Sequence, residues 1–173
     1  MNLYKADIDY CNYLAYYEPK IPYVDNEKEN RPFIGVVLCV NGKNFFAPLT
    51  SPKKKHLEMK DMQDFLKIDD GKLGSINLNN MIPIPKRYLK EIKMQDIKNI
   101  KYRKMLENQL HWINANMLRI NNRARNLYYL VTQNKATKSL IDRCCNFRLL
   151  EYRCQEFMNK NYINEDEILY LYA

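Results

Sequence analysis

The sequence predicts an α+β fold in a single domain, in which a strand-rich first half shares one core with a helical second half. Up to Pro85 the apolar residues lie in short runs separated by turn residues, which is typical of strands. Beyond Pro85 they recur at helical spacing. The length of 173 residues, with 46% hydrophobic and 28% charged residues, fits one globular core. Because no repeat or linker divides the chain, we expect one domain over residues 1–173.

The first predicted elements are a short strand at Leu3–Lys5 and a helix that begins after Asp7. An aspartate is a favoured N-cap, and apolar residues recur at helical spacing from Tyr10 to Tyr17. Pro19 then ends the helix, because proline lacks the backbone donor that a helix interior needs.

Two β-hairpins are predicted next. The pair Asn41-Gly42 lies between the apolar runs Phe33–Val40 and Lys43–Leu49, which predicts a tight primed turn between two strands. The runs Phe65–Ile68 and Leu73–Asn77, separated by Asp and Gly residues, predict a second hairpin.

An edge strand and several helices complete the prediction. Met81–Pro85 is extended, but its prolines cannot donate ladder hydrogen bonds, so we expect an edge strand or a loop that flanks a strand. The apolar stripes Tyr102–Met117 and Ile120–Val131 predict two helices or one bent helix. Asn146 can cap a last helix that runs through Phe157. The final residues, 163–173, are acidic and then apolar, and they favour neither a strand nor a helical turn.

The net charge of +8 is concentrated in the second half of the chain. Residues 86–160 carry 17 Lys and Arg against 6 Asp and Glu, whereas residues 1–85 carry equal numbers of both. Such a field attracts polyanions, of which RNA, DNA and acidic membranes are the candidates. A membrane-surface role is the weakest of these, because no helix combines a purely basic face with an opposite Trp, Phe and Leu face.

The composition predicts a cytoplasmic protein without a metal or another cofactor. No apolar run approaches the roughly 20 residues that span a bilayer, and the start of the chain lacks the apolar segment of a signal peptide. The five cysteines include no CxxC pair and fit reduced thiols that pack as small apolar groups. The two histidines, His56 and His111, lie far apart, so the chain lacks the spacing of a zinc site.

The clearest chemical signal follows the strand predicted to end at Leu49. Thr50 and Ser51 supply hydroxyl groups, Pro52 stiffens the chain, and Lys53–Lys55 supply positive charge. A phosphate group is bound by such donors and cations on a short rigid loop, so we predict a phosphate-handling site here. The plainer alternative is a solvated turn between strands, which the same charges would also suit.

Five segments, in order along the chain, carry a family resemblance: Phe33–Cys39, Ala47-Pro48-Leu49-Thr50-Ser51-Pro52-Lys53-Lys54, Leu73–Pro85, Tyr102–Asn116 and Cys145-Asn146-Phe147-Arg148-Leu149-Leu150-Glu151. They resemble the ToxN/AbiQ family, the toxins of type III toxin–antitoxin systems. The resemblance extends to about Phe157, and the Pro-Leu-Thr-Ser-Pro-Lys run is its most specific part.

This resemblance implies a fold, an activity and a partner. The implied fold is a strongly bent antiparallel sheet, an SH3-like barrel core with flanking helices, similar to the MazF and Kid ribonuclease toxins. The implied activity is metal-independent cleavage of single-stranded RNA by its own 2′-hydroxyl, which leaves a 2′,3′-cyclic phosphate and a 5′-hydroxyl. The implied partner is a small antitoxin RNA, cut into pseudoknot units that then inhibit the toxin in a cyclic assembly.

The resemblance also assigns four catalytic candidates. Lys53 aligns with the active-site lysine of the family and would stabilise negative charge on the phosphorane. Thr50 and Ser51 match positions that hold the non-bridging oxygens, and Tyr10 matches a residue near the scissile phosphate. Each has a plainer interpretation. Lys53 would be a surface cation, Thr50 and Ser51 would be turn formers, and Tyr10 would be one core aromatic among 14 tyrosines.

The other basic residues are predicted to bind RNA, although any one of them could be an ordinary solubilising charge. His56 would contact phosphate, and its ordinary pKa near ~6.5 would also suit a general acid or base. Tyr128 and Tyr129 could stack on unpaired bases. Arg119, Arg123 and Arg125 are spaced so that one or two of them lie on a common helical face. The predicted RNA-binding residues are Lys20, Arg31, Lys54, Lys55, His56, Lys101, Arg103, Lys104, Arg119, Arg123 and Arg125.

Two rival functions stay open at this point. One is a non-catalytic protein that only sequesters a structured RNA, which would show no cutting. The other is a DNA-binding protein, which would bind duplex DNA well and folded RNA poorly at a fixed salt concentration.

Overall fold

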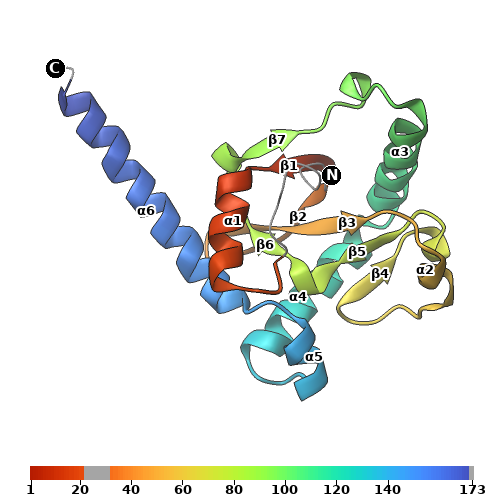
Figure 1. Ribbon diagram of the computed structural model, residues 1–173. Helices are drawn as coiled ribbons and strands as arrows, with labels where there is room; N and C mark the ends of the chain where they lie inside the picture. Colours follow the sequence, from red (N-terminus) through yellow and green to blue (C-terminus); the bar gives the residue numbers. More distant parts are fainter. Residues whose placement is uncertain (22–31, 172–173) are drawn as a thin grey trace.

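The computed structural model describes residues 1–21 and 32–171, with side chains as far as Lys160. An antiparallel sheet with helices around it forms the α+β fold (Figure 1), as predicted. The strand order is β4-β5-β3-β2-β1-β7, and β6 pairs with β3. The strands are β1 (Asn2–Ala6), β2 (Phe33–Val40), β3 (Lys43–Thr50), β4 (Phe65–Lys67), β5 (Ser75–Asn77), β6 (Ile82–Pro83) and β7 (Leu89–Glu91).

The first predicted hairpin is confirmed. Val40 pairs with Lys43 across the Asn41-Gly42 turn, and both turn residues have positive φ, at 50° and 69°, as a primed turn requires. Strand β3 pairs with β2 on one side and with β6 and then β5 on the other. It is therefore the central strand, and its last residue, Thr50, lies against β5.

The second hairpin and the edge strand are also confirmed, with shorter strands than predicted. Leu66 pairs with Ile76 in the β4–β5 hairpin, and Ile82 in β6 pairs with Phe46 in β3. Strand β7, which pairs with β1 at the sheet edge, was not predicted. Its three residues, Leu89–Glu91, include two charges and are too few to show an alternating pattern.

The strand pairing does not close the sheet into the predicted barrel. Within residues 1–21 and 32–171 the order runs from β4 to β7, and no pairing joins these two end strands. The sheet is therefore open. Its first strands, β4 and β5, form an arm that extends from the end of β3, with the short helix α2 (Lys54–Glu58) beside it (Figure 1).

The helices follow the predicted pattern with two additions. Helix α1 (Ile8–Tyr17) is capped by Asp7, whose Oδ1 accepts a hydrogen bond from the Tyr10 amide at 2.9 Å. The two apolar stripes are separate helices that meet at Asn116, which has non-helical φ and ψ of −113° and 16°. The additions are α2 and α5. The helices of the second half are α3 (Ile100–Ala115), α4 (Met117–Thr132), α5 (Lys138–Arg143) and α6 (Phe147–Leu171).

Helix α6 is longer than predicted and extends away from the body of the protein (Figure 1). The predicted helix ended near Phe157, but no Pro or Gly follows that residue to stop it. Short 3₁₀ turns join the other elements: η1 (Asp69–Gly71), η2 (Leu78–Asn80), η3 (Lys86–Tyr88) and η4 (Met94–Asp96).

One hydrophobic core joins the sheet to the helices. It includes Phe45 from β3, Leu106 from α3, Ile120 from α4 and Phe147 from α6, all almost fully buried. Four of the five cysteines are buried and free, as predicted, whereas Cys39 is free and exposed. No helix in the described part of the chain is long and apolar enough to cross a bilayer.

Candidate active site

The candidate site begins where β3 leaves the sheet. Residues Phe45–Leu49 are buried and Thr50 is partly exposed, so the chain comes to the surface at Thr50. Ser51, Pro52 and Lys53 form a short irregular segment, and helix α2 begins at Lys54. We call residues 50–55 the phosphate loop. The sequence predicted a loop here but not the helix, whose five residues are too few to show a period.

The structure brings three of the four predicted catalytic residues together. Thr50 is half-buried, and Ser51 and Lys53 are exposed on the same short segment. The Lys53 backbone is extended, and its carbonyl oxygen accepts a hydrogen bond from the His56 amide at 2.9 Å. Two hydroxyl groups and an ammonium group can thus approach one phosphate from adjacent positions of the chain. The neighbouring cations Lys54 and Lys55 are exposed as well.

The turn between β4 and β5 supports this loop from one side. Gly74 has a φ of 97°, and a Cβ there would overlap the carbonyl oxygen of Thr50. A Cβ at Gly71 would similarly overlap the carbonyl oxygen of His56. Only glycine permits such close backbone approach in this conformation. The two glycines therefore let the turn pack directly against Thr50, the first residue of the phosphate loop, and against His56, which follows its last residue.

Side chains of β5 also contact Thr50. The Nδ2 of Asn77 donates a hydrogen bond to Thr50 Oγ1 at 3.1 Å, and the buried Ser75 hydroxyl donates to Asn77 Oδ1 at 3.4 Å. Thr50 and Ser75 are directly opposite each other in the β3–β5 pairing. Asn77 was not predicted as a site residue. Residues 51–74 separate β3 from β5, so the register between these two strands does not follow from either hairpin pattern.

His56 does not lie where the sequence analysis placed it. The residue was predicted to contact RNA, but its side chain is 2% exposed and packs against the Phe65 ring. Burial, followed by the charges of Lys55 and Lys53, lowers the pKa of His56 below its usual value. The imidazole is therefore neutral at pH 7 and part of the support beneath the loop. A buried ring cannot contact RNA, so His56 is not a phosphate ligand in this conformation.

Tyr10 is a second correction. Its side chain is fully buried, its hydroxyl donates to the Pro83 carbonyl at 2.5 Å, and its ring stacks on Tyr88 with centroids 5.2 Å apart. Burial, followed by the proximity of Cys154, raises the pKa of Tyr10 well above its usual value. The Asp7 cap starts α1 in the register that turns Tyr10 inward. The structure therefore places the Tyr10 side chain in the core, in agreement with its plainer interpretation as a core aromatic.

Replacing Tyr10 by phenylalanine tests this assignment. We expect the free energy of unfolding to fall by about 1 to 3 kcal/mol, because the Pro83 carbonyl would lose its donor. The cutting rate per folded molecule should not change. Urea unfolding and an RNA cleavage assay measure the two quantities. Tyr16→Phe is the matched control, since Tyr16 is 72% exposed on the same helix. A Tyr10→Phe protein of normal stability that cuts RNA much more slowly would contradict the assignment.

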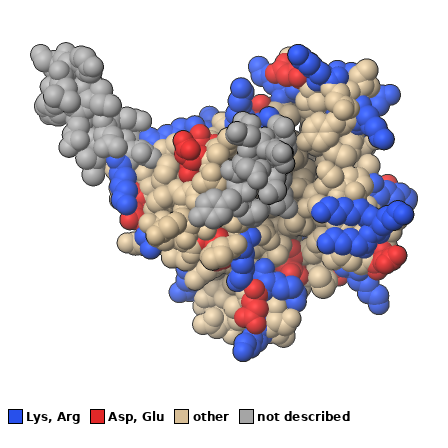
Figure 2. Space-filling model, viewed as in Figure 1, with Lys and Arg blue, Asp and Glu red and all other residues tan. Residues whose placement is uncertain are grey.

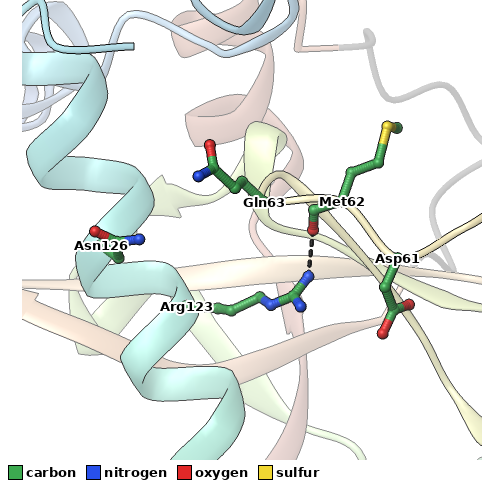
Figure 3. A pocket seen from close by; sticks show the side chains of 5 residues that line it. All are labelled: Asp61, Met62, Gln63, Arg123 and Asn126. Atoms are coloured by element: carbon green, nitrogen blue, oxygen red, sulfur yellow. Dashed lines mark hydrogen bonds between the residues drawn. The ribbon is translucent and has the colours of Figure 1, made fainter.

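The predicted cations on α4 lie beside the segment that follows α2. Arg119 forms an ion pair with Asp61 at 2.5 Å, and Arg123 Nη1 donates to the Met62 carbonyl oxygen. Figure 3 shows Arg123 and Asn126 on α4 facing Asp61, Met62 and Gln63, the five residues that line a shallow pocket. Arg119 and Arg123 thus share one face of the helix, as their spacing predicts.

The other predicted RNA-binding residues are more dispersed. Lys101 and Lys104 are exposed on α3 and Arg125 on α4, whereas Arg103 lies 3.9 Å from Glu107. Lys20 donates to the Cys144 carbonyl at 2.6 Å, and Arg31 lies outside the described residues. Figure 2 shows Lys and Arg gathered along the right-hand side of the molecule, where α2 and α3 lie in Figure 1. Among the described residues, no group of three or more His, Cys, Asp or Glu side chains could hold a metal ion.

Comparison with known proteins gives matches along most of the chain. The family model of the toxin ToxN, from type III toxin–antitoxin systems, matches residues 2–155. An endoribonuclease ToxN from Pectobacterium atrosepticum is 34% identical over 165 residues, which are 91% of this chain and 94% of that protein. An endoribonuclease ToxN from Bacillus thuringiensis subsp. kurstaki is 31% identical over 163 residues, which are 91% of this chain and 84% of that protein.

Solved structures share the same arrangement of elements. One comes from work on a processed non-coding RNA that regulates a bacterial antiviral system; it has a TM-score of 0.77 and 34% identity, over 90% of this chain and 98% of that one. Another comes from work on selective toxin inhibition by a non-coding RNA pseudoknot. It has a TM-score of 0.77 and 29% identity, over 91% of this chain and 97% of that one.

Proposed function

The chain belongs to the ToxN family of toxins of type III toxin–antitoxin systems, and from this membership we infer the chemistry of its site. It is the toxin of such a system and an endoribonuclease. We propose that it cuts single-stranded RNA without a metal ion. The observation that supports this proposal is the placement of the half-buried Thr50 and the exposed Ser51 and Lys53 on one short surface segment with rigid support.

In the proposed reaction the RNA supplies its own nucleophile. The 2′-oxygen attacks the adjacent phosphorus, the bond from phosphorus to the 5′-oxygen breaks, and the products are a 2′,3′-cyclic phosphate and a 5′-hydroxyl. The proton of the 2′-hydroxyl is removed, and the departing 5′-oxygen gains a proton. The protein must hold the phosphate in line with the attacking oxygen and stabilise the charge that develops on it.

The residues of the phosphate loop would have different roles in this reaction. The Lys53 ammonium group would stabilise the added negative charge of the phosphorane, because that charge is greater there than in the bound RNA. The hydroxyl groups of Thr50 and Ser51 would hold the non-bridging oxygens. Neither hydroxyl acts as a covalent nucleophile. Lys54 and Lys55 would contact neighbouring phosphates of the same strand.

We propose that the antitoxin is a small structured RNA. One related structure comes from work on selective toxin inhibition by a non-coding RNA pseudoknot. The concentration of positive charge in residues 86–160 suits such a partner. The exposed Lys101, Lys104 and Arg125 are available to bind it. Arg119 would join them once RNA phosphates compete with Asp61, and Arg123 once they compete with the Met62 carbonyl. A pseudoknot processed by the toxin would then inhibit it, in a cyclic assembly of protein and RNA.

Two finer features belong to the same proposal. The toxin would act in the cytoplasm, where its RNA substrates are. The bent sheet would be related in shape to the barrel core of the MazF and Kid toxins, although its described strands leave it open.

End-group analysis of RNA cut in the presence of EDTA tests the proposed reaction. We expect the purified protein to cut single-stranded RNA in EDTA as fast as without it, and to leave cyclic phosphate and 5′-hydroxyl ends. A 3′-hydroxyl with a 5′-phosphate, or loss of activity in EDTA, would contradict the mechanism. Binding without any cutting would instead support the non-catalytic RNA-binding alternative.

A further inference from the structure

We propose that Gln109 on α3 is a positioning residue, which holds the turn between β4 and β5 in the place where it supports the phosphate loop. This turn comprises residues 68–74. The inference rests on the proposed function, because the loop that the turn supports is the one assigned to the RNA phosphate. It adds a residue from a helix that contributes none of the predicted catalytic groups.

Gln109 lies on the buried face of α3. Its side chain is 1% exposed, and the buried residues Leu106 and Ile113 precede and follow it at helical spacing. Positions of this kind are usually apolar, because a buried amide must form hydrogen bonds to offset its lost contact with water. The partner of the amide therefore accounts for a polar residue at this point of the core.

That partner is the backbone of the turn. Gln109 Nε2 donates a hydrogen bond to the Leu73 carbonyl oxygen at 2.6 Å. The other end of the amide, Oε1, is buried and has no partner among the residues that the structure describes. A reversed amide would place this oxygen against the Leu73 carbonyl, and two acceptors cannot form a hydrogen bond. The NH₂ group must therefore face the turn.

The turn has a backbone conformation that needs such a restraint. Asp69 and Asp70 have φ of 47° and 52°, and Gly71 and Gly74 have φ of 93° and 97°. A positive φ is uncommon for residues other than glycine, and a chain keeps it where the surrounding structure fixes it. Backbone hydrogen bonds within the turn supply part of this restraint. The bond from Gln109 adds a restraint from a separate element.

The same turn packs against the phosphate loop. Gly74 follows Leu73 directly, and a Cβ at Gly74 would overlap the Thr50 carbonyl oxygen. Gly71 approaches the backbone of the residue after the loop in the same way. Because packed backbones leave no free space between them, a shift of the turn would also shift the loop. A continuous series of contacts therefore leads from Gln109 through Leu73 and Gly74 to Thr50.

Gln109→Met tests the inference, since methionine has a similar size but no amide. With an RNA whose cut site has been mapped using the unmodified protein, we expect the single-turnover cutting rate to fall by about 10- to 100-fold, because the loop is displaced from the phosphate. The Kd for the same RNA with a 2′-deoxy nucleotide at the cut site should change by less than about twofold, because the exposed cations of the phosphate loop and of α3 remain.

Stability separates positioning from general support of the fold. Gln109→Met removes the donor to Leu73, which destabilises the protein, but it also removes the unpaired Oε1, which stabilises it. We therefore expect the urea midpoint to change little while the cutting rate falls. A residue that only supports the fold would show the opposite result, with a lower midpoint and a normal cutting rate per folded molecule.

Gln109→Glu tests the hydrogen bond itself. A protonated carboxyl group can donate to the Leu73 carbonyl as the amide does, whereas an ionised carboxylate cannot. Because burial raises the pKa of a carboxyl group, the cutting rate of this variant relative to the wild type should rise at least about fivefold from about pH 8 to about pH 6. The same ratio for Gln109→Met should not depend on pH.

Two results would overturn the inference. One is a Gln109→Met protein that cuts within about threefold of the wild-type rate. The other is a Gln109→Glu protein whose relative rate does not rise toward acid pH. The second measurement decides the question by itself if Gln109→Met does not fold.

The control is Asn116→Ala, which removes another hydrogen bond from a side-chain amide to a backbone carbonyl, from Asn116 Nδ2 to Trp112 at 2.9 Å. Asn116 follows the last residue of α3, and its partner lies within that helix and not in the turn. The cutting rate should therefore stay at the wild-type value. Cutting by the unmodified protein in EDTA tests the proposed function separately. If that cutting occurs and Gln109→Met cuts normally, only the role of Gln109 is overturned.

Discussion

Replacing Lys53 by alanine is expected to lower kcat for RNA cutting by about 100- to 1,000-fold, the usual cost of losing one group that stabilises developing charge. Binding should change little, because Lys54 and Lys55 stay exposed beside the phosphate and supply most of the general attraction. Single-turnover cutting of a mapped RNA measures the first quantity, and the Kd for a 2′-deoxy analogue of that RNA measures the second.

Lys60→Ala is the matched control for Lys53→Ala. Lys60 is also exposed, but it lies beyond α2 and outside the phosphate loop. The control should cut RNA at the wild-type rate. Equal losses of binding and cutting at position 53 would mean that Lys53 is only one of several electrostatic contacts. Normal cutting by Lys53→Ala would remove it from the mechanism.

Replacing Gly74 by alanine is the second change with a large expected effect. The new Cβ would overlap the Thr50 carbonyl oxygen, and the φ of 97° is itself unfavourable for alanine. We expect a loss of more than about 2 kcal/mol in the free energy of unfolding, and a cutting rate at least about 100-fold lower per folded molecule, because Thr50 and Ser51 must move. Urea unfolding and single-turnover cutting measure the two effects.

Gly42→Ala provides the comparison that separates backbone strain from displacement of the loop. Gly42 also has a positive φ, at 69°, but a Cβ there would have no neighbour within 4 Å. This variant should lose only about 1 kcal/mol of stability and keep normal cutting. If Gly74→Ala behaved in the same way as Gly42→Ala, the contact between Gly74 and Thr50 would not position the site.

Local patterns were sufficient to predict most of the fold. The Asn41-Gly42 pair specifies its own turn through the positive φ of both residues, and the prolines of Met81–Pro85 account for an edge strand. The elements that were missed, β7, α2 and α5, contain three, five and six residues, which are too few to show a period. The pairing of β7 also depends on β1, which is distant in the sequence. The helix α6 was predicted to end too early, because the absence of Pro and Gly indicates a continuing helix less clearly than their presence indicates its end.

The candidate site was predictable to a smaller extent. The surface positions of the half-buried Thr50 and the exposed Ser51 and Lys53 follow from the end of an apolar strand. The burial of His56 could not be predicted from local sequence, since it depends on where the β4–β5 arm packs. The inward direction of Tyr10 could not be predicted either, because its partners Pro83 and Tyr88 lie far along the chain. The contact from Asn77 to Thr50 depends likewise on strand register across the insertion between them.

The cysteines have a practical consequence for solution studies. Of the five in the sequence, all within the described residues, Cys39 on β2 is the exposed one. Burial raises the pKa of Cys11 and Cys144 to about 12 and raises the pKa of Cys145 and Cys154 as well, so these four thiols are both hidden and protonated. A maleimide dye added to the native protein would therefore attach at one place, and fluorescence anisotropy could follow RNA capture without any engineered residue.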